Sequence, residues 1–162
     1  MSSGTPSEIG LNLDADAVLD FAMKHPKINK DKLVLFGRSL GGAVAISLGN
    51  RNQGKVAAIV VENTFLSIAD MVDSLMPWAR RVKHFILRIN WDNYHKIQII
   101  TSPIYFIASE LDEIVPATHM KKLYEAAAKS SHKEFYHVIG GTHNDAFEVA
   151  GEKYYDVGKF VL

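Results

Sequence analysis

One short stretch of the sequence carries a predicted strand directly into a glycine-bounded turn and then into a predicted helix. The apolar run 33–36 favours a buried strand, and the small and apolar residues 42–48 favour a helix. Between them, residues 37–41 read Gly-Arg-Ser-Leu-Gly, which matches G-x-S-x-G. A serine at so sharp a turn needs glycine two positions before and after it, because side chains there would collide with neighbouring elements. The stretch therefore predicts a nucleophile elbow that exposes the Ser39 hydroxyl above a sheet edge.

A five-residue pattern with two free positions also occurs by chance, so the elbow interpretation depends on context and partners. The helix that follows Ser39 directs free backbone N–H groups and its positive end toward a developing anion. The N–H of Leu40 is the candidate oxyanion donor. A serine nucleophile also needs a histidine base and an acid that orients it, in the chain order Ser, acid, His.

Three further apolar runs, 56–61, 104–108 and 135–139, predict strands that alternate with helical patterns. This alternation predicts an α/β fold with a mostly parallel sheet of about four strands flanked by helices. We expect a first helix that is capped by Asn12 and stopped by Pro26, and a second helix over 67–76. A third helix should begin at Pro116, with an apolar stripe of Met120, Leu123, Tyr124 and Ala127. A closing helix is marked by Tyr154, Val157 and Val161. The apolar face of the first helix is expected to comprise Ala15, Val18, Leu19 and Ala22.

Composition limits the classes of function. A chain of 162 residues that is 48% hydrophobic forms one domain, 1–162, with its own core. The 18 basic residues equal the 18 acidic ones, so bulk charge does not favour nucleic acid. Without cysteine there is no thiolate site, and we expect no metal or cofactor. No apolar run approaches the roughly 18 residues of a membrane span, and the first eight residues do not resemble a signal peptide.

Residues 67–95 are expected to form a helical lid or excursion within this domain. From Trp78 to Ile89, apolar residues recur at helical spacing, and the other positions are rich in Arg and Lys without any acidic residue. Such a basic amphipathic helix can contact an anionic membrane surface. The interpretation that we favour is a lid whose charged side chains face water.

Among seven histidines, His143 is the favoured base because of its position. It lies in a glycine-flanked loop directly after the strand predicted over 135–139. Loops at the carboxyl ends of parallel strands meet at one edge, so His143 should share the edge of Ser39. The other histidines are expected to be surface or packing residues: His25, His84, His95, His119, His132 and His137.

Three acidic residues, Glu110, Asp112 and Glu113, follow the strand predicted over 104–108. Asp112 is favoured because its apolar neighbours suggest a turn that buries them and directs the carboxylate inward. Those neighbours are Leu111, Ile114 and Val115.

Two other carboxylates remain in consideration. Glu62, at the end of the strand over 56–61, is the second choice for the acid, and Asp145 is expected to shape the loop of His143. We expect the His143 ring to lie within about 3.5 Å of both the Ser39 hydroxyl and the Asp112 carboxylate.

Four strings together resemble the α/β-hydrolase superfamily, and more closely its branch of Bem-type hydrolases and α/β-hydrolase domain-containing protein 13. They are Gly-Arg-Ser-Leu-Gly-Gly at 37–42, Val-Glu-Asn-Thr-Phe-Leu-Ser-Ile at 61–68, Leu-Asp-Glu-Ile-Val-Pro at 111–116 and Gly-Thr-His-Asn-Asp at 141–145. The resemblance covers nearly the whole chain. It implies a serine hydrolase that cleaves an ester, thioester or amide of a small or lipid-like acyl group, with Ser39 as nucleophile, Asp112 as acid and His143 as base.

The resemblance departs from the family pattern at the front. In the superfamily the elbow follows the fifth strand of an eight-stranded sheet, whereas only a loop and a helix precede Lys32 here. We therefore expect a chain that begins mid-fold, without the family's N-terminal membrane anchor. It would also lack the oxyanion donor of an early loop, and one such donor is worth about 10²–10³ in rate. Residues 32–37 would form an exposed edge that favours self-association.

The alternative function is a catalytically weak binding module that acts through this edge or through the segment from Trp78 to Ile89. A nucleotide-binding domain is disfavoured, because residues 37–42 do not match G-x-G-x-x-G and no lysine follows in the P-loop position.

Overall fold

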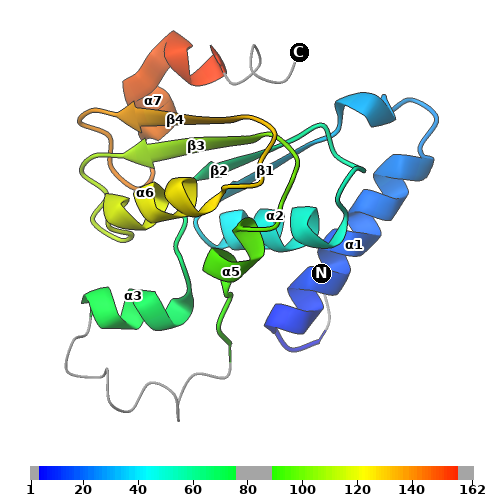
Figure 1. The fold of residues 1–162 in the computed structure, drawn as a ribbon, viewed down its shortest axis with the longest axis horizontal. Coiled ribbons are helices and arrows are strands. Elements are labelled where there is room, and N and C mark those ends of the chain that lie inside the picture. The colour runs from blue at the N-terminus through cyan, green and yellow to red at the C-terminus, as the bar shows by residue number, and fades with distance from the viewer. Residues whose placement is uncertain (1–3, 76–88, 157–162) are drawn as a thin grey trace.

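The computed structural model describes residues 4–75 and 89–156, which are built around a four-stranded parallel sheet (Figure 1). The strands are β1 (Val34–Arg38), β2 (Ala58–Glu62), β3 (Ile104–Ser109) and β4 (Lys133–Val138). They lie in the sheet in their sequence order, and each neighbouring pair is parallel. The predicted fold class is confirmed, and all four predicted strands are present with ends that differ by at most two residues.

Helices cover both faces of the sheet (Figure 1). One face is covered by α2 (Leu40–Arg51), α5 (Asn93–Ile97) and α6 (Ala117–Ala126), and α1 (Glu8–Lys24) packs against α2. The opposite face carries α7 (Ala146–Ala150) and the 3₁₀ helix η3 (Gly151–Asp156). The remaining elements are α3 (Ile68–Leu75), which follows β2, and the 3₁₀ helix η1 (Lys30–Lys32), which precedes β1.

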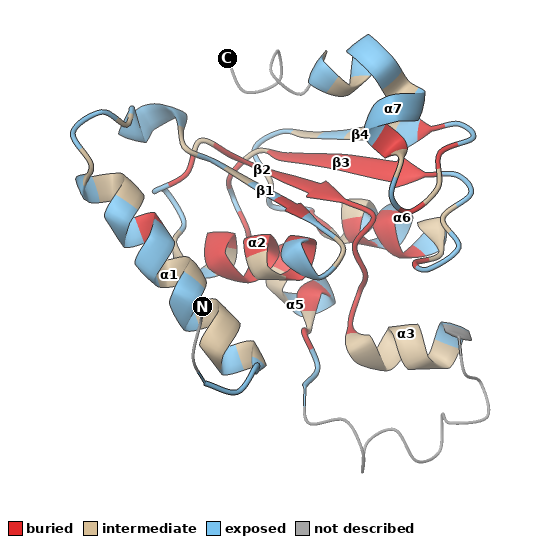
Figure 2. Ribbon diagram, turned by 180° about the vertical axis from the view of Figure 1, so that it is seen from behind, coloured by how far each residue is buried: buried red, intermediate tan, exposed pale blue. Residues whose placement is uncertain are grey.

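The core lies against the two central strands, whose residues are all buried (Figure 2). Ile59 and Phe106 point to the face of α2, α5 and α6, while Tyr105 and Ile107 pack toward α7. The apolar stripe predicted on α6 is confirmed, since Met120, Leu123 and Ala127 are buried and Tyr124 packs against the same cluster. Continuous apolar strands are expected where helices cover both faces of a parallel sheet.

The first helix starts earlier than predicted. Ser7, rather than Asn12, is the N-cap of α1, and its hydroxyl accepts a hydrogen bond from the Gly10 N–H at 3.0 Å. The prediction for Val18 is wrong because its side chain is 68% exposed, whereas Leu19 is buried. The helix ends at Lys24, before Pro26, as expected.

Two predicted helices differ from the structure or lie outside it. The chain after the last strand forms two short helical elements, α7 and η3, and the predicted markers Val157 and Val161 lie outside the described residues. Of the predicted lid over 67–95, residues 76–88 lie outside the described residues, and they include the basic segment from Trp78 to Ile89 except for Ile89 itself. The membrane contact of this segment therefore stays a prediction.

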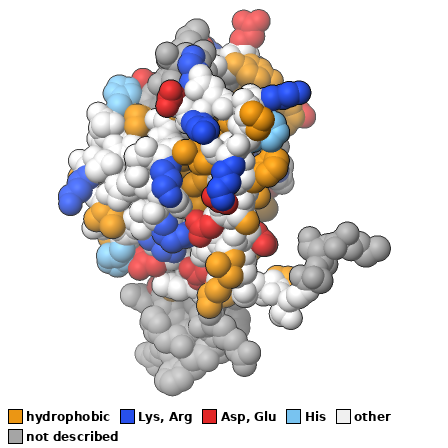
Figure 3. All heavy atoms as spheres, turned by 90° about the vertical axis from the view of Figure 1, so that its right-hand side faces the viewer, with side chains coloured by type: hydrophobic (Ala, Val, Ile, Leu, Met, Phe, Trp, Pro, Cys, Tyr) orange, Lys and Arg blue, Asp and Glu red, His pale blue; other side chains and the backbone are white. Residues whose placement is uncertain are grey.

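β1 occupies one edge of the sheet and is more exposed than its neighbours. Its burial alternates, with Val34 at 37% and Phe36 at 56% exposure. The adjacent α1 also carries exposed apolar side chains, among them Ile9, Leu13 and Phe21. Figure 3 looks onto the side of the molecule where α1 lies, and apolar side chains are interspersed there with basic and acidic ones.

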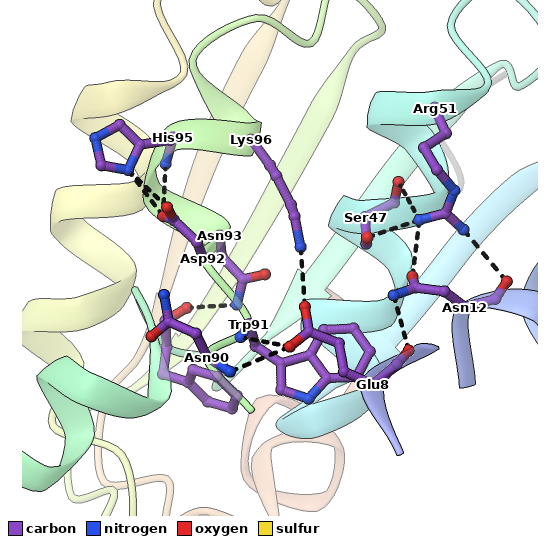
Figure 4. A network of polar contacts seen from close by, with 11 residues as sticks. Glu8, Asn12, Ser47, Arg51, Asn90, Trp91, Asp92, Asn93, His95 and Lys96 are labelled. Carbon is purple, nitrogen blue, oxygen red and sulfur yellow. Dashed lines mark hydrogen bonds and ion pairs between the residues drawn. The ribbon is translucent and has the colours of Figure 1, made fainter. Parts of the chain in front are cut away.

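A polar network joins the first turn of α1 to the chain just before α5 (Figure 4). One carboxylate oxygen of Glu8 accepts hydrogen bonds from the N–H groups of Asn90 and Trp91, both at 3.1 Å, and the other lies 3.4 Å from the Lys96 ammonium. Burial would raise the pKa of Glu8, but the two backbone donors and Lys96 outweigh it and lower the pKa. Glu8 thus fixes the position of the buried Trp91 relative to α1.

Substituting Glu8→Ala should lower the free energy of unfolding by roughly 1–3 kcal/mol at neutral pH, because two backbone donors lose a charged acceptor. The pKa of Glu8 is lowered in the folded state, so its contribution is fully present above the ordinary value of 4.5. The contribution disappears as the pH falls through the lowered native pKa. Urea denaturation of both chains between pH 3 and pH 7 checks this, and a difference that stays constant over that range would contradict it.

The exposed edge leads to a second prediction, that the chain associates through β1 as its concentration rises. No strand pairs with the outer side of β1 in the part of the chain that the structure describes, and unpaired edges promote association. Phe36→Lys should reduce the association by placing a charge beside the edge. Light scattering over a concentration series measures this, and a concentration-independent wild-type monomer would contradict it.

Candidate active site

The turn between β1 and α2 holds Ser39 in a strained backbone conformation. Its φ is 54° and its ψ is −121°, and a positive φ at a non-glycine residue costs roughly 1–3 kcal/mol. Two hydrogen bonds hold the residue in place: the Ser39 N–H donates to the Glu62 carbonyl at 2.9 Å, and the Thr64 hydroxyl donates to the Ser39 carbonyl at 2.7 Å. The end of β2 therefore braces the turn at the end of β1.

The close backbone packing that the turn requires falls on Gly37 and Gly42. A Cβ on Gly37 would lie 2.2 Å from the Gly41 carbonyl oxygen, so only glycine fits. The expectation for Gly41 is wrong, because a Cβ there would meet no atom within 4 Å outside the backbone of its own helix. Gly42 instead faces Thr64, whose Cβ would lie 2.6 Å from an added Cβ. The second tight position thus lies one residue later, where α2 passes the end of β2.

Asp112 and His143 are in direct contact at the carboxyl end of the sheet. His143 Nδ1 lies 2.8 Å from Asp112 Oδ2, and their side chains are only 6% and 1% exposed. The other carboxylate oxygen accepts hydrogen bonds from the N–H groups of Ile114, at 2.9 Å, and Val115, at 2.7 Å. Because an ionised carboxylate only accepts hydrogen bonds, Nδ1 is the protonated nitrogen of this contact, and in the neutral imidazole Nε2 is then an acceptor.

The reason for which the sequence favoured Asp112 is only partly right. Val115 is buried, but Leu111 and Ile114 are 59% and 44% exposed, so burial of apolar neighbours does not orient the turn. The carboxylate is oriented by its own hydrogen bonds to the backbone two and three residues ahead, a conformation that Asp adopts readily in turns.

The other carboxylates of these loops bind backbone N–H groups rather than the imidazole. Glu110 accepts from Gly140 at 2.9 Å, and Glu113 accepts from the backbone of His143 at 3.2 Å. Asp145 accepts from Thr142 at 2.6 Å and so shapes the loop, as expected. The loop of His143 is therefore tied to the loop of Asp112 at several points.

Glu62, the second choice for the acid, has a different partner. Its carboxylate is buried and accepts a hydrogen bond from the Tyr154 hydroxyl of η3. Burial raises the pKa of Glu62, while Tyr154 and the charges of Arg38 and His143 act in the opposite direction. Glu62 thus lies near the imidazole, and its described hydrogen bond goes to Tyr154.

The loop of Ser39 lies beside the loop of His143. Among the described residues, no hydrogen bond joins the Ser39 side chain to the His143 side chain. The guanidinium of Arg38 lies 3.4 Å from the Asn144 carbonyl oxygen. The two loops also flank the end of β2, where Thr64 contacts Ser39 and Asn63 contacts His143.

Sequence reasoning missed the structural roles of Asn63 and Thr64, although both belong to one of the family-like strings. The available signal was their position, since polar residues directly after a fully apolar strand lie at the edge where α/β folds place their sites.

Leu40 lies at the first helical position of α2, where a backbone N–H has no acceptor within the helix.

The other described histidines have structural partners. His95 pairs with Asp92, His132 pairs with Glu134, and His25 caps the end of α1. His119 is buried, which lowers its pKa, and its Nδ1 accepts from the Leu66 N–H at 3.3 Å. His137 lies in β4 as predicted, and His84 lies outside the described residues.

A cavity of about 880 Å³ lies away from this edge, between α3, the chain before α5 and α6. Its lining includes Asp70, Tyr94 and Lys122 but none of the three candidate catalytic residues. Within residues 4–75 and 89–156, no group of three or more His, Cys, Asp or Glu side chains converges in a way that could hold a metal ion. No helix in these ranges has the length and apolar character needed to cross a membrane.

The family comparison agrees with this arrangement. Residues 10–95 match the hydrolase family model described as "Serine aminopeptidase, S33". The chain belongs to this α/β-hydrolase family. The matched residues include the elbow and the end of β2, whereas the Asp112 and His143 loops lie beyond them.

Two curated relatives show the extent of the similarity. The α/β-hydrolase chain is 38% identical to Protein bem46 of Schizosaccharomyces pombe over 96% of its own length and 52% of that protein. It is 37% identical to the uncharacterized membrane protein YNL320W of Saccharomyces cerevisiae over 96% of its own length and 54% of that protein. The chain therefore spans about half the length of the curated relatives that it matches.

A solved structure shows the same fold. The esterase Pf2001 of Pyrococcus furiosus superposes with a TM-score of 0.73 at 19% identity, covering 98% of this chain and 64% of the esterase. At this identity the likeness establishes the α/β-hydrolase fold alone.

The different surroundings of the elbow glycines provide a test of the turn. Gly37→Ala should lower the free energy of unfolding by roughly 1–3 kcal/mol or more, because its Cβ overlaps backbone that cannot move aside. Gly41→Ala is the matched control and should be neutral or stabilising by up to about 1 kcal/mol, since alanine favours helix. Denaturant melts of both variants measure the effect, and equal losses would contradict this account.

Proposed function

We propose that the chain is a serine hydrolase that cleaves a carboxylic ester, thioester or amide through an acyl-enzyme. The observation that carries the proposal is the buried contact between Asp112 and His143, next to a strained turn that presents Ser39. Membership in a hydrolase family and the fold shared with an esterase support it.

In the first half of the reaction, His143 Nε2 accepts the proton of the Ser39 hydroxyl as its oxygen attacks the carbonyl carbon of the substrate. The Leu40 N–H donates a hydrogen bond to the oxyanion of the tetrahedral intermediate. His143 then gives the proton to the leaving group, and the acyl group remains on Ser39. In the second half, water takes the place of the serine hydroxyl, and the acid is released with Ser39 restored.

Asp112 acts on the histidine rather than on the substrate. Its 2.8 Å contact holds the proton on Nδ1, which turns the unprotonated Nε2 toward the reaction, and its negative charge stabilises the imidazolium that forms. Because two backbone N–H groups hold the other carboxylate oxygen, Asp112 has little freedom to leave the imidazole. An acyl group of small-molecule or lipid-like chemistry is the proposed substrate.

A fluorophosphonate probe tests the proposal directly, since it reacts only with an activated serine. Wild-type protein should be labelled, and Ser39→Ala should not. Ser67→Ala is the matched control, because Ser67 is buried and its hydroxyl hydrogen-bonds to Asp70. In an ester assay, Ser39→Ala should lower turnover by up to roughly 10⁶ and Asp112→Asn by up to roughly 10⁴, which are the losses in enzymes with a complete oxyanion hole.

A folded wild-type chain that the probe does not label would contradict the hydrolase proposal. It would favour the binding module, whose candidate surface within the described residues is the β1 edge. Labelling that persists in Ser39→Ala would instead place the nucleophile elsewhere.

A further inference from the structure

Asn63 is a buried residue whose side chain joins the ends of two strands to the loop of His143. It is 1% exposed. Its Oδ1 accepts from the Ser109 N–H at 2.8 Å. Its Nδ2 lies 3.0 Å from the Ser109 hydroxyl, 3.1 Å from the His143 carbonyl oxygen and 3.4 Å from the Thr142 carbonyl oxygen. One amide thus connects the end of β2, the end of β3 and the loop after β4.

With these contacts, Asn63 joins Asp112 and Glu113 as a side chain that hydrogen-bonds to His143. Asp112 binds the imidazole, Glu113 accepts from the backbone N–H of His143, and Asn63 donates to its carbonyl oxygen. Ser109, which Asn63 also binds, is the last residue of β3 and lies three residues before Asp112. Asn63 therefore contacts both segments whose separation sets the distance between Asp112 and the imidazole.

The backbone explains why an asparagine suits this position. The φ of Asn63 is 45°, in the left-handed region that asparagine and glycine tolerate better than other residues. Its N–H donates to the Ile107 carbonyl at 3.0 Å, which anchors this conformation to β3. Aspartate would keep the shape and the acceptor for the Ser109 N–H, but its carboxylate has no hydrogen to donate to the two carbonyls.

We infer that Asn63 is a positioning residue, which holds the His143 loop so that the imidazole stays on Asp112. This inference rests on the proposed triad for its role in catalysis, whereas its structural content is independent of activity. Asn63 touches neither the imidazole nor the Ser39 hydroxyl in these contacts; it acts through the backbone of His143.

The structural part is tested by proton NMR on the full chain. The His143 N–H that is hydrogen-bonded to Asp112 should give a low-field resonance, assigned by its loss in His143→Gln. Asn63→Gly, which tolerates the positive φ but removes the amide, should lose the resonance, and so should Asn63→Asp. Ser109→Ala is the matched control: it removes a buried hydroxyl that contacts Asn63 and leaves the bonds to the His143 loop, so it should keep the resonance.

The catalytic part is tested by kinetics with a p-nitrophenyl ester. Asn63→Asp should lower kcat by about 10–100-fold with little change in KM, because a small displacement of a catalytic group slows the reaction without weakening substrate binding. Ser109→Ala should stay close to wild type. Thermal melts of all variants separate this effect from a general loss of stability.

The outcomes are distinct from those of the hydrolase proposal. A resonance that survives in folded Asn63→Gly or Asn63→Asp, that is lost equally in Ser109→Ala, or that is missing from the wild type would overturn the inference. If Asn63→Gly does not fold, Asn63→Asp decides alone. If the probe does not label the wild type but the resonance depends on Asn63 as expected, the hydrolase proposal fails and the positioning role stands.

Discussion

The site depends on two neighbouring residues with left-handed backbone, Ser39 at the end of β1 and Asn63 at the end of β2. Their φ values are 54° and 45°, and each such residue costs roughly 1–3 kcal/mol that packing must offset. The register places Arg38 opposite Glu62, so the two turns leave adjacent strands at the same level. Both turns are anchored by backbone hydrogen bonds to the next strand, from Ser39 to Glu62 and from Asn63 to Ile107.

The carboxylates at this edge of the sheet differ in the hydrogen-bond donor that each one binds. Each one lies where a particular donor is available: the imidazole for Asp112, backbone N–H groups for Glu110 and Glu113, and a tyrosine hydroxyl for Glu62. A buried carboxylate without donors would be costly. Which carboxylate is the candidate acid therefore depends on the donor that each one faces, and sequence position alone does not specify this.

This explains how far the sequence could predict the molecule. Apolar runs give the four strands, because helices on both faces require continuous apolar strands. The contact between Asp112 and His143 follows from the rule that strand ends meet at one edge. The roles of Gly41, Gly42 and Asn63 depend on how α2 and the His143 loop approach β2. The sequence pattern does not specify, to within one residue, where α2 and the His143 loop contact β2.

The same dependence on tertiary contact explains the errors at the ends of helices. Asn12 and Ser7 are both good N-caps by residue type. Ser7 is the N-cap because the first helical residue, Glu8, is held by Asn90 and Trp91, which are more than 80 positions away. Val18 fits the helical period of the buried face, but α2 covers only a narrow stripe of α1.

The two halves of the candidate triad are held in different ways. Asp112 and His143 follow β3 and β4, and their loops are joined by Glu110, Glu113 and Asn63. Ser39 follows β1, which is an edge strand like β4 among the described strands. Its turn is held by the Glu62 carbonyl and the Thr64 hydroxyl, and Arg38 beside it contacts the Asn144 carbonyl oxygen. The candidate nucleophile is therefore tied mainly to the end of β2, whereas the candidate acid and base are tied to each other.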